Sequence, residues 1–172
     1  MLISDGYLDL QRQMHAAPKG YGQKGDKWAE VVAELAAPAG IATILDYGCG
    51  QGALGRALRD RGLTVGEYDP AIKAKADRPA PADLVVCTDV LEHIEPDCIE
   101  AVLDDLVRVT RRKCFLVIAL TEAGKVLPDG RNAHILLRPV EWWMERLSAR
   151  FDFDRPVPCR SHKEFAAVWR AL

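Results

Sequence analysis

The chain has 172 residues, of which 49% are hydrophobic and 28% are charged, and its formal net charge is −2. This composition is typical of a soluble globular protein with room for one domain. The small net charge gives no electrostatic reason to expect nucleic acid or an anionic membrane as a partner. No stretch reaches the ~18 apolar residues of a membrane span, and the first five residues lack the basic-then-apolar order of a signal peptide.

The five cysteines are Cys49, Cys87, Cys98, Cys114 and Cys159, and no two of them form a C-x-x-C pair. An odd number of cysteines without a signal peptide favours reduced thiols, so we expect the protein in the cytoplasm. Cys87 and Cys114 stand in apolar runs and are expected to be inert core residues. Because the cysteines lack zinc-ligand spacing, we expect no metal site.

A helical and loop segment is expected before the first strand. The polar, glycine-containing first 27 residues indicate a short helix and then a loop, with Lys19–Lys27 at its centre. A helix should follow from Asp26 to Ala37, because Trp28 and later apolar residues recur at helical spacing, and Pro38 should end it.

From residue 43 onward, the sequence pattern alternates between strands and helices. We expect strands at Thr43–Tyr47, Leu63–Tyr68, Leu84–Thr88 and Cys114–Leu120, with two more near Asp152–Val157 and Glu164–Trp169. Helices are expected at Ala53–Arg61, Pro96–Thr110 and Pro139–Arg150. This α/β alternation predicts a mostly parallel sheet with helices on both faces, which binds ligands at the carboxyl ends of its strands.

A glycine-rich turn between the first strand and its helix is the most informative stretch. The sequence ILDYGCGQGAL at positions 44–54 places three glycines at alternate positions after an apolar run. Such a turn lets backbone N–H groups approach a ligand closely. The spacing Gly48-x-Gly50-x-x-Ala53, with Asp69 downstream, also satisfies the dinucleotide-binding pattern. The turn alone therefore leaves two ligand classes open.

The acids around this turn favour S-adenosylmethionine over a dinucleotide. Asp46 stands at the end of the strand, where a carboxylate would repel a pyrophosphate but would attract the ammonium of a methionine group. Asp69 ends the second strand, where a carboxylate can accept hydrogen bonds from both ribose hydroxyls. A further polar cluster, Asp89–His93, follows the strand at Leu84–Thr88.

With these motifs, the chain resembles the class I S-adenosylmethionine-dependent methyltransferases. The residues that carry the resemblance are Leu45–Gly52, Tyr68–Pro70 and Asp89–His93. The resemblance implies a Rossmann-like, doubly wound, mostly parallel seven-stranded sheet with an antiparallel last strand. Only 13 residues separate Asp69 from Asp83, so we expect the sheet to be shortened around strand three, with adenine recognition in doubt.

The resemblance also assigns the cofactor site by motif position. Asp46 and the backbone of Gly48 and Gly50 would hold the methionine portion, and Asp69 would hold the ribose. Thr88, Asp89 and Val90 would line the methyl-donor side, and the motif neighbours Tyr47, Cys49, Gly52 and Pro70 complete the predicted set. Each of three residues has a structural alternative to a cofactor role. Gly52 could allow close packing of the helix on the strand, and the side chains of Tyr47 and Cys49 could face the core. We expect one domain over residues 1–172, in which residues 1–38 cover the cofactor.

Three residues are candidates for the acceptor side. The loop from Thr121 to His134 is long, and long loops in compact domains are usually functional. Asn132 and His134 would share a side if the loop is extended, and a neutral His134 suits a general base or a positioning group. His93 lies at the same sheet edge. Each histidine has a structural alternative: His134 could cap the helix that follows it, and His93, with Glu92, could anchor the helix that follows them.

The leading functional hypothesis is methyl transfer to an oxygen or nitrogen atom of a small-molecule acceptor by in-line displacement. Nucleic acid is disfavoured, because Thr88–Leu91 replaces the Asn/Asp-Pro-Pro-aromatic run and the chain has no basic stripe. A methyltransferase acting on a protein or RNA, or a non-catalytic S-adenosylmethionine-binding protein, is the alternative. A dinucleotide oxidoreductase ranks third. The sequence does not predict the oligomeric state.

Overall fold

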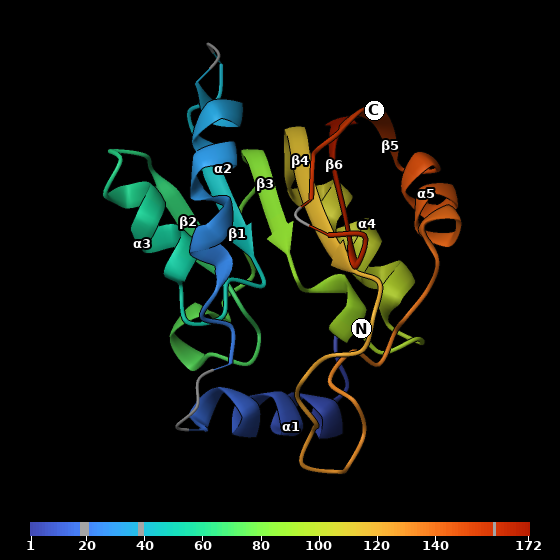
Figure 1. The fold of residues 1–172 in the computed structure, drawn as a ribbon. Helices are drawn as coiled ribbons and strands as arrows, with labels where there is room; N and C mark the ends of the chain where they lie inside the picture. The colour runs from blue at the N-terminus through green and yellow to red at the C-terminus, as the bar shows by residue number, and fades with distance from the viewer. Residues whose placement is uncertain (18–20, 38–39, 160) are drawn as a thin grey trace.

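A computed structural model describes residues 1–17, 21–37, 40–159 and 161–172. Its strands are β1 (Ile44–Tyr47), β2 (Val65–Tyr68), β3 (Ala82–Thr88), β4 (Thr110–Ala119), β5 (Phe151–Pro156) and β6 (Glu164–Ala171). In the described residues these strands form one six-stranded sheet in the order β2-β1-β3-β4-β6-β5 (Figure 1). Strands β1 to β4 pair in parallel, whereas β6 is antiparallel to both of its neighbours, β4 and β5.

The sheet confirms the α/β architecture and the antiparallel last strand, but it has six strands where seven were expected. The count of seven came from the resemblance, and the segment between Asp69 and Asp83 does not supply the extra strand. This segment contains only the short 3₁₀ helix η2 (Lys73–Lys75) and irregular backbone. A further parallel strand would need two connections, one of them at least about 10 residues long with its helix. Thirteen residues cannot hold both connections and the strand.

Helices cover both faces of the sheet. On one face lie the 3₁₀ helix η1 (Gly25–Trp28), α2 (Ala29–Ala36) and α3 (Ala53–Arg59), and on the other lie α4 (Ile99–Val109) and α5 (Val140–Ser148). Strand β4 serves both cores, since Phe115 packs with the first group of helices and Leu116 with the second. This alternation explains why residues 114–119 are almost wholly apolar. Cys87 and Cys114 are fully buried, as predicted.

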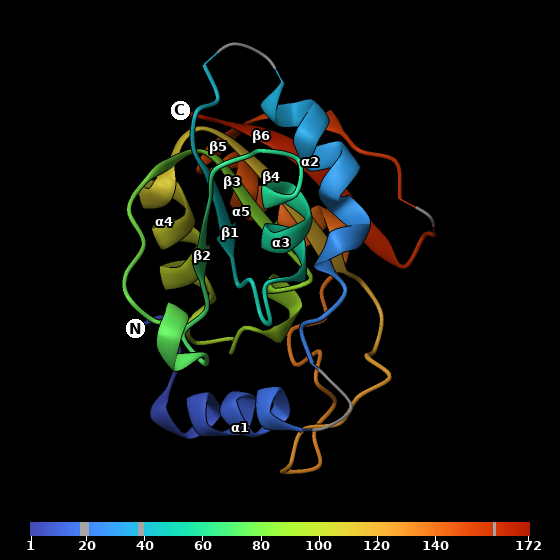
Figure 2. The same ribbon diagram turned by 90° about the vertical axis from the view of Figure 1, so that its left-hand side faces the viewer.

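Helix α1 (Asp5–Ala16) lies outside these layers, across the edge at which β1 and β3 end (Figures 1 and 2). The Ser4 hydroxyl oxygen caps the helix by accepting a hydrogen bond from the backbone N–H of Tyr7. Tyr7 and Met14 pack against Leu127 and Ala133 of the loop that follows β4. Helix α1 therefore lies beside the carboxyl ends of β1 and β3, with the loop after β4 against it.

Most predicted element positions are confirmed, with ends that differ by a few residues. The helix predicted from Asp26 to Ala37 is η1 followed directly by α2. Its predicted stop at Pro38 lies outside the described residues, as do Lys19 and Gly20 of the predicted loop. None of the helices in the described ranges combines the length and the apolar character that a bilayer crossing requires.

Candidate functional site

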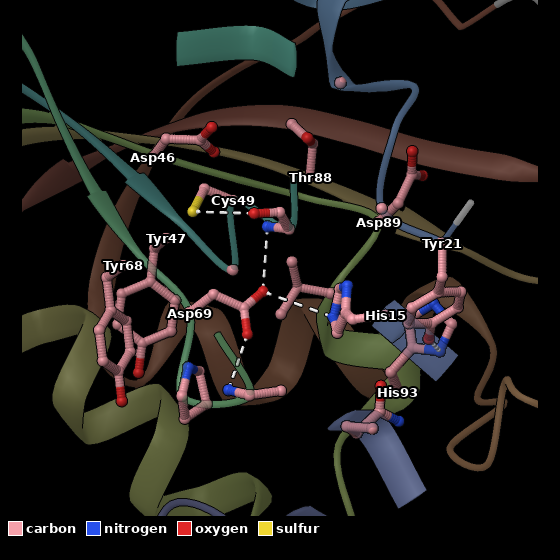
Figure 3. A pocket seen from close by; sticks show the side chains of 18 of the residues that line it. His15, Tyr21, Asp46, Tyr47, Cys49, Tyr68, Asp69, Thr88, Asp89 and His93 are labelled. Carbon is pink, nitrogen blue, oxygen red and sulfur yellow. Dashed lines mark hydrogen bonds and ion pairs between the residues drawn. The ribbon is translucent and has the colours of Figure 1, made fainter. Parts of the chain in front are cut away.

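A cavity of about 550 Å³ opens at the carboxyl ends of β1, β2 and β3, against α1. Ten of the eleven predicted cofactor residues line it, and Gly52 is the exception among the described residues (Figure 3). These ten are Asp46, Tyr47, Gly48, Cys49, Gly50, Asp69, Pro70, Thr88, Asp89 and Val90. Three separate motifs of the sequence thus meet at one place.

Two glycines of the turn have both a special backbone conformation and no room for a side chain. Gly48 has φ +76° and Gly50 has φ +51°, in the left-handed region that favours glycine. A Cβ at Gly48 would collide with the Val90 side chain, and one at Gly50 would lie 2.7 Å from the carbonyl oxygen of Gly22. At Gly52 a Cβ would instead meet the side chains on β2 and η2, which favours the helix–strand packing interpretation for this residue.

The Asp46 carboxylate is buried with one oxygen unsatisfied. Asp46 is 3% exposed, and its Oδ2 has no hydrogen-bond partner in the part of the chain that the structure describes. Burial, followed by the nearby charge of Glu67, raises the Asp46 pKa to about 7. A buried acceptor of this kind is stabilised by a cationic donor, and an ammonium group would supply one.

The Asp69 carboxylate is held by the backbone on both sides. Its Oδ2 accepts a hydrogen bond from the Gly50 N–H at 3.0 Å, and its Oδ1 accepts one from the Ala71 N–H at 2.9 Å (Figure 3). A carboxylate has about four lone-pair sites, so both oxygens retain capacity for hydroxyl donors. His15 of α1 lies above this group, with Nε2 3.9 Å from Oδ2. Burial lowers the pKa of His15, which favours the neutral ring.

Aromatic rings and a buried thiol also line the cavity. The Tyr47 hydroxyl donates to Asp105 Oδ2 at 3.1 Å, and its ring lies 5.0 Å from that of Tyr68. Tyr47 therefore contributes a ring face to the cavity while its polar end is satisfied in the core. Burial raises the pKa of the Cys49 thiol to about 12, so this thiol is not a reactive group at neutral pH.

His93 lies where the cofactor cavity meets a second cavity of about 370 Å³. Its Nδ1 is 2.7 Å from the carbonyl oxygen of Ala133, and the hydroxyl oxygen of Tyr21 is 2.9 Å from the same nitrogen. A carbonyl oxygen only accepts, so Nδ1 carries the proton and Nε2 retains its lone pair. Burial, followed by His134, lowers the His93 pKa to about 4, which keeps the ring neutral at pH 7.

His134 and Asn132 have different positions. His134 lines the second cavity, where its ring centroid lies 4.7 Å from that of His93 and its Nδ1–H donates to the Thr121 carbonyl at 2.5 Å. Asn132 lines neither cavity within the described ranges. Its amide group exchanges hydrogen bonds with the backbone of Ala123, and its Oδ1 also accepts one from the His134 N–H at 2.9 Å. Asn132 therefore braces the loop that carries His134.

Sequence reasoning expected residues 1–38 over the cofactor but did not identify which residues of α1 line the cavity. Tyr7, Gln11 and His15 line the cofactor cavity, and their spacing of four residues places them on one helical face. This stripe of mixed apolar and polar residues is the sequence feature from which the cavity-lining face of α1 could have been predicted. Sequence reasoning also treated Glu92 only as a neighbour of His93. Glu92 is fully buried, and its Oε1 accepts a hydrogen bond from the Ala119 N–H at 3.1 Å.

Comparison with protein families gives one match that covers most of the chain. A family model described as a methyltransferase domain matches residues 18–153. Comparison with curated proteins gives no significant match.

Solved structures with the same fold include several methyltransferases at low sequence identity. Magnesium protoporphyrin IX methyltransferase from Synechocystis PCC 6803, with bound S-adenosylhomocysteine, has a TM-score of 0.64 and 17% identity over 98% of this chain and 95% of its own. The N-methyltransferase NodS from Bradyrhizobium japonicum WM9, in complex with S-adenosylhomocysteine, has a TM-score of 0.62 and 17% identity over 98% and 99%. The 1,6-didemethyltoxoflavin-N1-methyltransferase from Burkholderia thailandensis has a TM-score of 0.64 and 18% identity over 96% and 89%. At these identities the likeness establishes the shared fold.

Proposed function

The chain belongs to the methyltransferase-domain family, and on that premise we propose that it transfers the methyl group of S-adenosylmethionine to a small-molecule acceptor at an oxygen or nitrogen atom. The observation that carries the proposal is the meeting of the glycine turn, Asp46 and Asp69 at one cavity. The unsatisfied oxygen of Asp46 would receive the ammonium group of the methionine portion. Asp69 would receive the ribose hydroxyls.

The reaction in this proposal is an in-line displacement. A lone pair of the acceptor atom attacks the methyl carbon, the carbon–sulfur bond breaks, and sulfur takes the bonding pair to give the neutral thioether of S-adenosylhomocysteine. A proton on the acceptor atom leaves to a base or to water. Alignment of the two reactants supplies much of the rate enhancement, and a general base adds about 10²–10⁴-fold where the proton must leave.

A small-molecule acceptor is supported by the second cavity and by the structural neighbours. The cavity of about 370 Å³ adjoins the cofactor cavity at His93 and is lined by polar residues such as Lys27 and His134. Two of the neighbours are named as methyltransferases of magnesium protoporphyrin IX and of 1,6-didemethyltoxoflavin, both small molecules. In this proposal His93 and His134 face the acceptor, while Asn132 acts through its support of the loop.

The decisive experiment is a calorimetric titration of the purified chain with S-adenosylhomocysteine and, separately, with NAD. We expect saturable binding of S-adenosylhomocysteine and none of NAD. Turnover against a panel of small hydroxyl and amine compounds, with short peptides and RNA oligonucleotides included, then identifies the acceptor class. Binding of NAD alone would overturn the proposal. Cofactor binding without product from any acceptor would favour a non-catalytic binding protein.

The variant Asp69→Ala tests the ribose assignment. Loss of hydrogen bonds to a charged group should weaken S-adenosylhomocysteine binding by about 1.5–3 kcal/mol, which is roughly 10- to 150-fold. Thermal unfolding serves as the control, because Asp69 also accepts the Gly50 and Ala71 N–H groups. An unchanged affinity in a folded variant would show that Asp69 does not hold the cofactor.

A further inference from the structure

Three potential metal ligands converge beside the second cavity, which His93 and His134 line and behind which Glu92 is fully buried. One side-chain ligand atom each from Glu92, His93 and His134 lies within 4.8 Å of the other two, and His134 Nε2 is 4.0 Å from Glu92 Oε1. Glu92 and His93 come from the 3₁₀ helix η3 (Leu91–His93) after β3, whereas His134 comes from the loop after β4. The cysteine pattern, on which the expectation of no metal rested, carries no information about this cluster.

The two imidazole rings have the hydrogen-bond pattern of metal-ligating histidines. In each ring, Nδ1 is hydrogen-bonded to a backbone carbonyl, that of Ala133 for His93 and that of Thr121 for His134. Such a bond fixes the tautomer and leaves Nε2 with an available lone pair, which is the arrangement found around metal-ligating histidines. The rings of His93 and His134 meet edge to face with centroids 4.7 Å apart, so the two side chains pack directly against each other.

The third group, Glu92, is a fully buried carboxyl with an unsatisfied atom. Glu92 has 0% exposure, and its Oε2 has no hydrogen-bond partner in the described part of the chain. Asp89 adds negative charge nearby, and it is held at φ +55°, a conformation that is uncommon for a residue with a side chain. Asp89 pairs with Lys27, whose Nζ lies 3.1 Å from Asp89 Oδ2, and both residues line the second cavity. A cation between the histidines would be met by the Glu92 carboxyl, whose Oε1 lies 4.0 Å from His134 Nε2, and would offset the negative charge of Glu92 and Asp89.

We propose that Glu92, His93 and His134 bind one divalent first-row transition metal ion, with zinc as the reference ion. Two imidazole nitrogens and one carboxylate oxygen form a donor set that suits such an ion better than magnesium or calcium, which prefer oxygen ligands. Ligand atoms of a tetrahedral zinc site lie roughly 3.3 Å apart, so the three groups need to move together by about 1 Å or less. Three protein ligands leave a coordination position open toward the cavity.

The role of this ion in the reaction rests on the proposed methyltransferase function, but the binding of the ion does not. A metal ion at the acceptor side would bind an acceptor hydroxyl oxygen and lower the pKa of that hydroxyl. The hydroxyl proton would leave to water, and the oxygen would then take the methyl group as the carbon–sulfur bond breaks. This arrangement favours an oxygen acceptor over a nitrogen acceptor.

Metal binding is tested on the full chain after treatment with a chelator and dialysis. We expect calorimetry to show one Zn²⁺ bound per chain with a dissociation constant below about 1 µM, and Co²⁺ to give the visible absorption of a nitrogen- and oxygen-ligated ion. His134→Ala should weaken zinc binding at least 100-fold, and His134→Cys, which restores a ligand, should recover most of it. His162→Ala, which removes an exposed histidine outside the three-residue cluster, is the matched control and should bind zinc as the original chain does.

Absence of stoichiometric zinc binding would overturn the proposal, and so would equal affinity in the original chain and His134→Ala. Glu92→Gln provides a second loss variant, and circular dichroism shows whether each variant is folded. S-adenosylhomocysteine binding is measured in the same samples. Zinc binding without S-adenosylhomocysteine binding would overturn the proposed function but leave the metal site, and the reverse result would do the opposite.

Discussion

Among the single residues of the cofactor cavity, Asp46 and Asp69 differ in how well their carboxylates are satisfied. Asp69 has a backbone donor on each oxygen, whereas Asp46 has an oxygen without a partner among the described residues. A carboxylate that is already satisfied is preorganised for neutral hydroxyl donors. An unsatisfied and buried carboxylate gains most from a cation, and it gains nothing while it is protonated.

Cofactor affinity should therefore rise with pH across the neutral range. The Asp46 pKa is raised to about 7, so the carboxylate that pairs with the ammonium group is largely absent at pH 6 and present at pH 8. The dissociation constant of S-adenosylhomocysteine should fall by up to about tenfold per pH unit below that pKa, as measured by calorimetry at pH 6, 7 and 8. Asp46→Asn should bind weakly with a flat profile. A flat profile in the original chain would contradict the role given to Asp46.

The variants Gly48→Ala and Gly62→Ala separate backbone strain from steric collision. Both residues have positive φ, +76° and +79°, but a Cβ at Gly48 meets Val90, whereas one at Gly62 meets no described atom within 4 Å. Gly62→Ala should lose about 1 kcal/mol of unfolding free energy and keep its affinity for S-adenosylhomocysteine. Gly48→Ala should lose about 1–3 kcal/mol more and bind more weakly. Urea unfolding and calorimetry measure both, and equal effects of the two variants would contradict the packing of Val90 on the turn.

Residues in local motifs could be predicted from the sequence, and residues whose place depends on distant contacts could not. Asp46, Gly48 and Asp69 stand within a few residues of a strand end, so the strand pattern fixes where they lie. Asn132 stands in a loop whose path is set by hydrogen bonds to Ala123, and by packing of the loop against α1. The prediction that Asn132 and His134 share a side assumed an extended loop, and the sequence does not reveal these contacts.

Among the elements, α1 is held over the cavity by a small number of polar contacts. The Ser4 N–H and hydroxyl both donate to the Glu95 carboxylate, at 2.8 and 2.7 Å, and the Tyr7 hydroxyl donates to the His93 carbonyl at 2.7 Å. These bonds join the start of α1 to the connection between β3 and α4. Because α1 also lines the cavity, its attachment and the retention of a bound cofactor should be coupled.

Glu95→Ala should accelerate release of the cofactor. Loss of the Ser4 contacts should cost about 1–2 kcal/mol, so the dissociation rate of S-adenosylhomocysteine should rise roughly 5- to 30-fold in stopped-flow experiments. Asp9→Ala is the matched control, since it breaks only the exposed Asp9–Arg12 ion pair of the same helix and should have little effect. Equal dissociation rates in the original chain and Glu95→Ala would mean that α1 does not retain the cofactor.

The order of the elements was largely predictable, because each element from β1 to β6 carries its own periodic pattern. The number of strands was not, since the resemblance supplied a seventh strand for which residues 70–82 have no room. The individual contacts of α1 could not be predicted either. Its amphipathic face predicts packing against another part of the chain, but several of its partners are distant in sequence, at Glu95 and in the loop after β4.

Over the whole molecule, buried ionisable groups should set how stability depends on pH. Burial raises the pKa of Asp46 from 3.8 to about 7 and that of Glu92 from 4.5 to about 8. The folded state thus favours the protonated form of both, and the stability this provides is lost as pH rises toward the folded pKa values. Burial lowers the His93 pKa from 6.5 to about 4, which reduces stability only as pH falls below 6.5.

The chain without cofactor or metal should therefore be less stable at pH 8 than at pH 6.5. In that window the two carboxyl groups lose protons that the folded state favours. His93 is neutral in the folded state and gives up its remaining half proton in the unfolded state, which offsets the loss by only about 0.4 kcal/mol. The loss should be on the order of 1–3 kcal/mol of unfolding free energy, measured by urea unfolding at the two pH values. Asp46→Asn should show a smaller loss. Greater stability at pH 8 than at pH 6.5 would contradict the burial of these groups.

The place of β6 in the sheet has a consequence for how the chain is made. Synthesis reaches β6 after every other strand of this sheet, yet β6 lies between β4 and β5. Until β6 leaves the ribosome, the apolar residues 114–119 of β4 have an open edge, and β5 has no neighbouring strand. Open apolar edges promote association between unfinished chains. To avoid such association, the nascent protein should depend on slow emergence from the ribosome or on a chaperone bound at this edge. This dependence should be greater than in a protein whose sheet is completed in chain order.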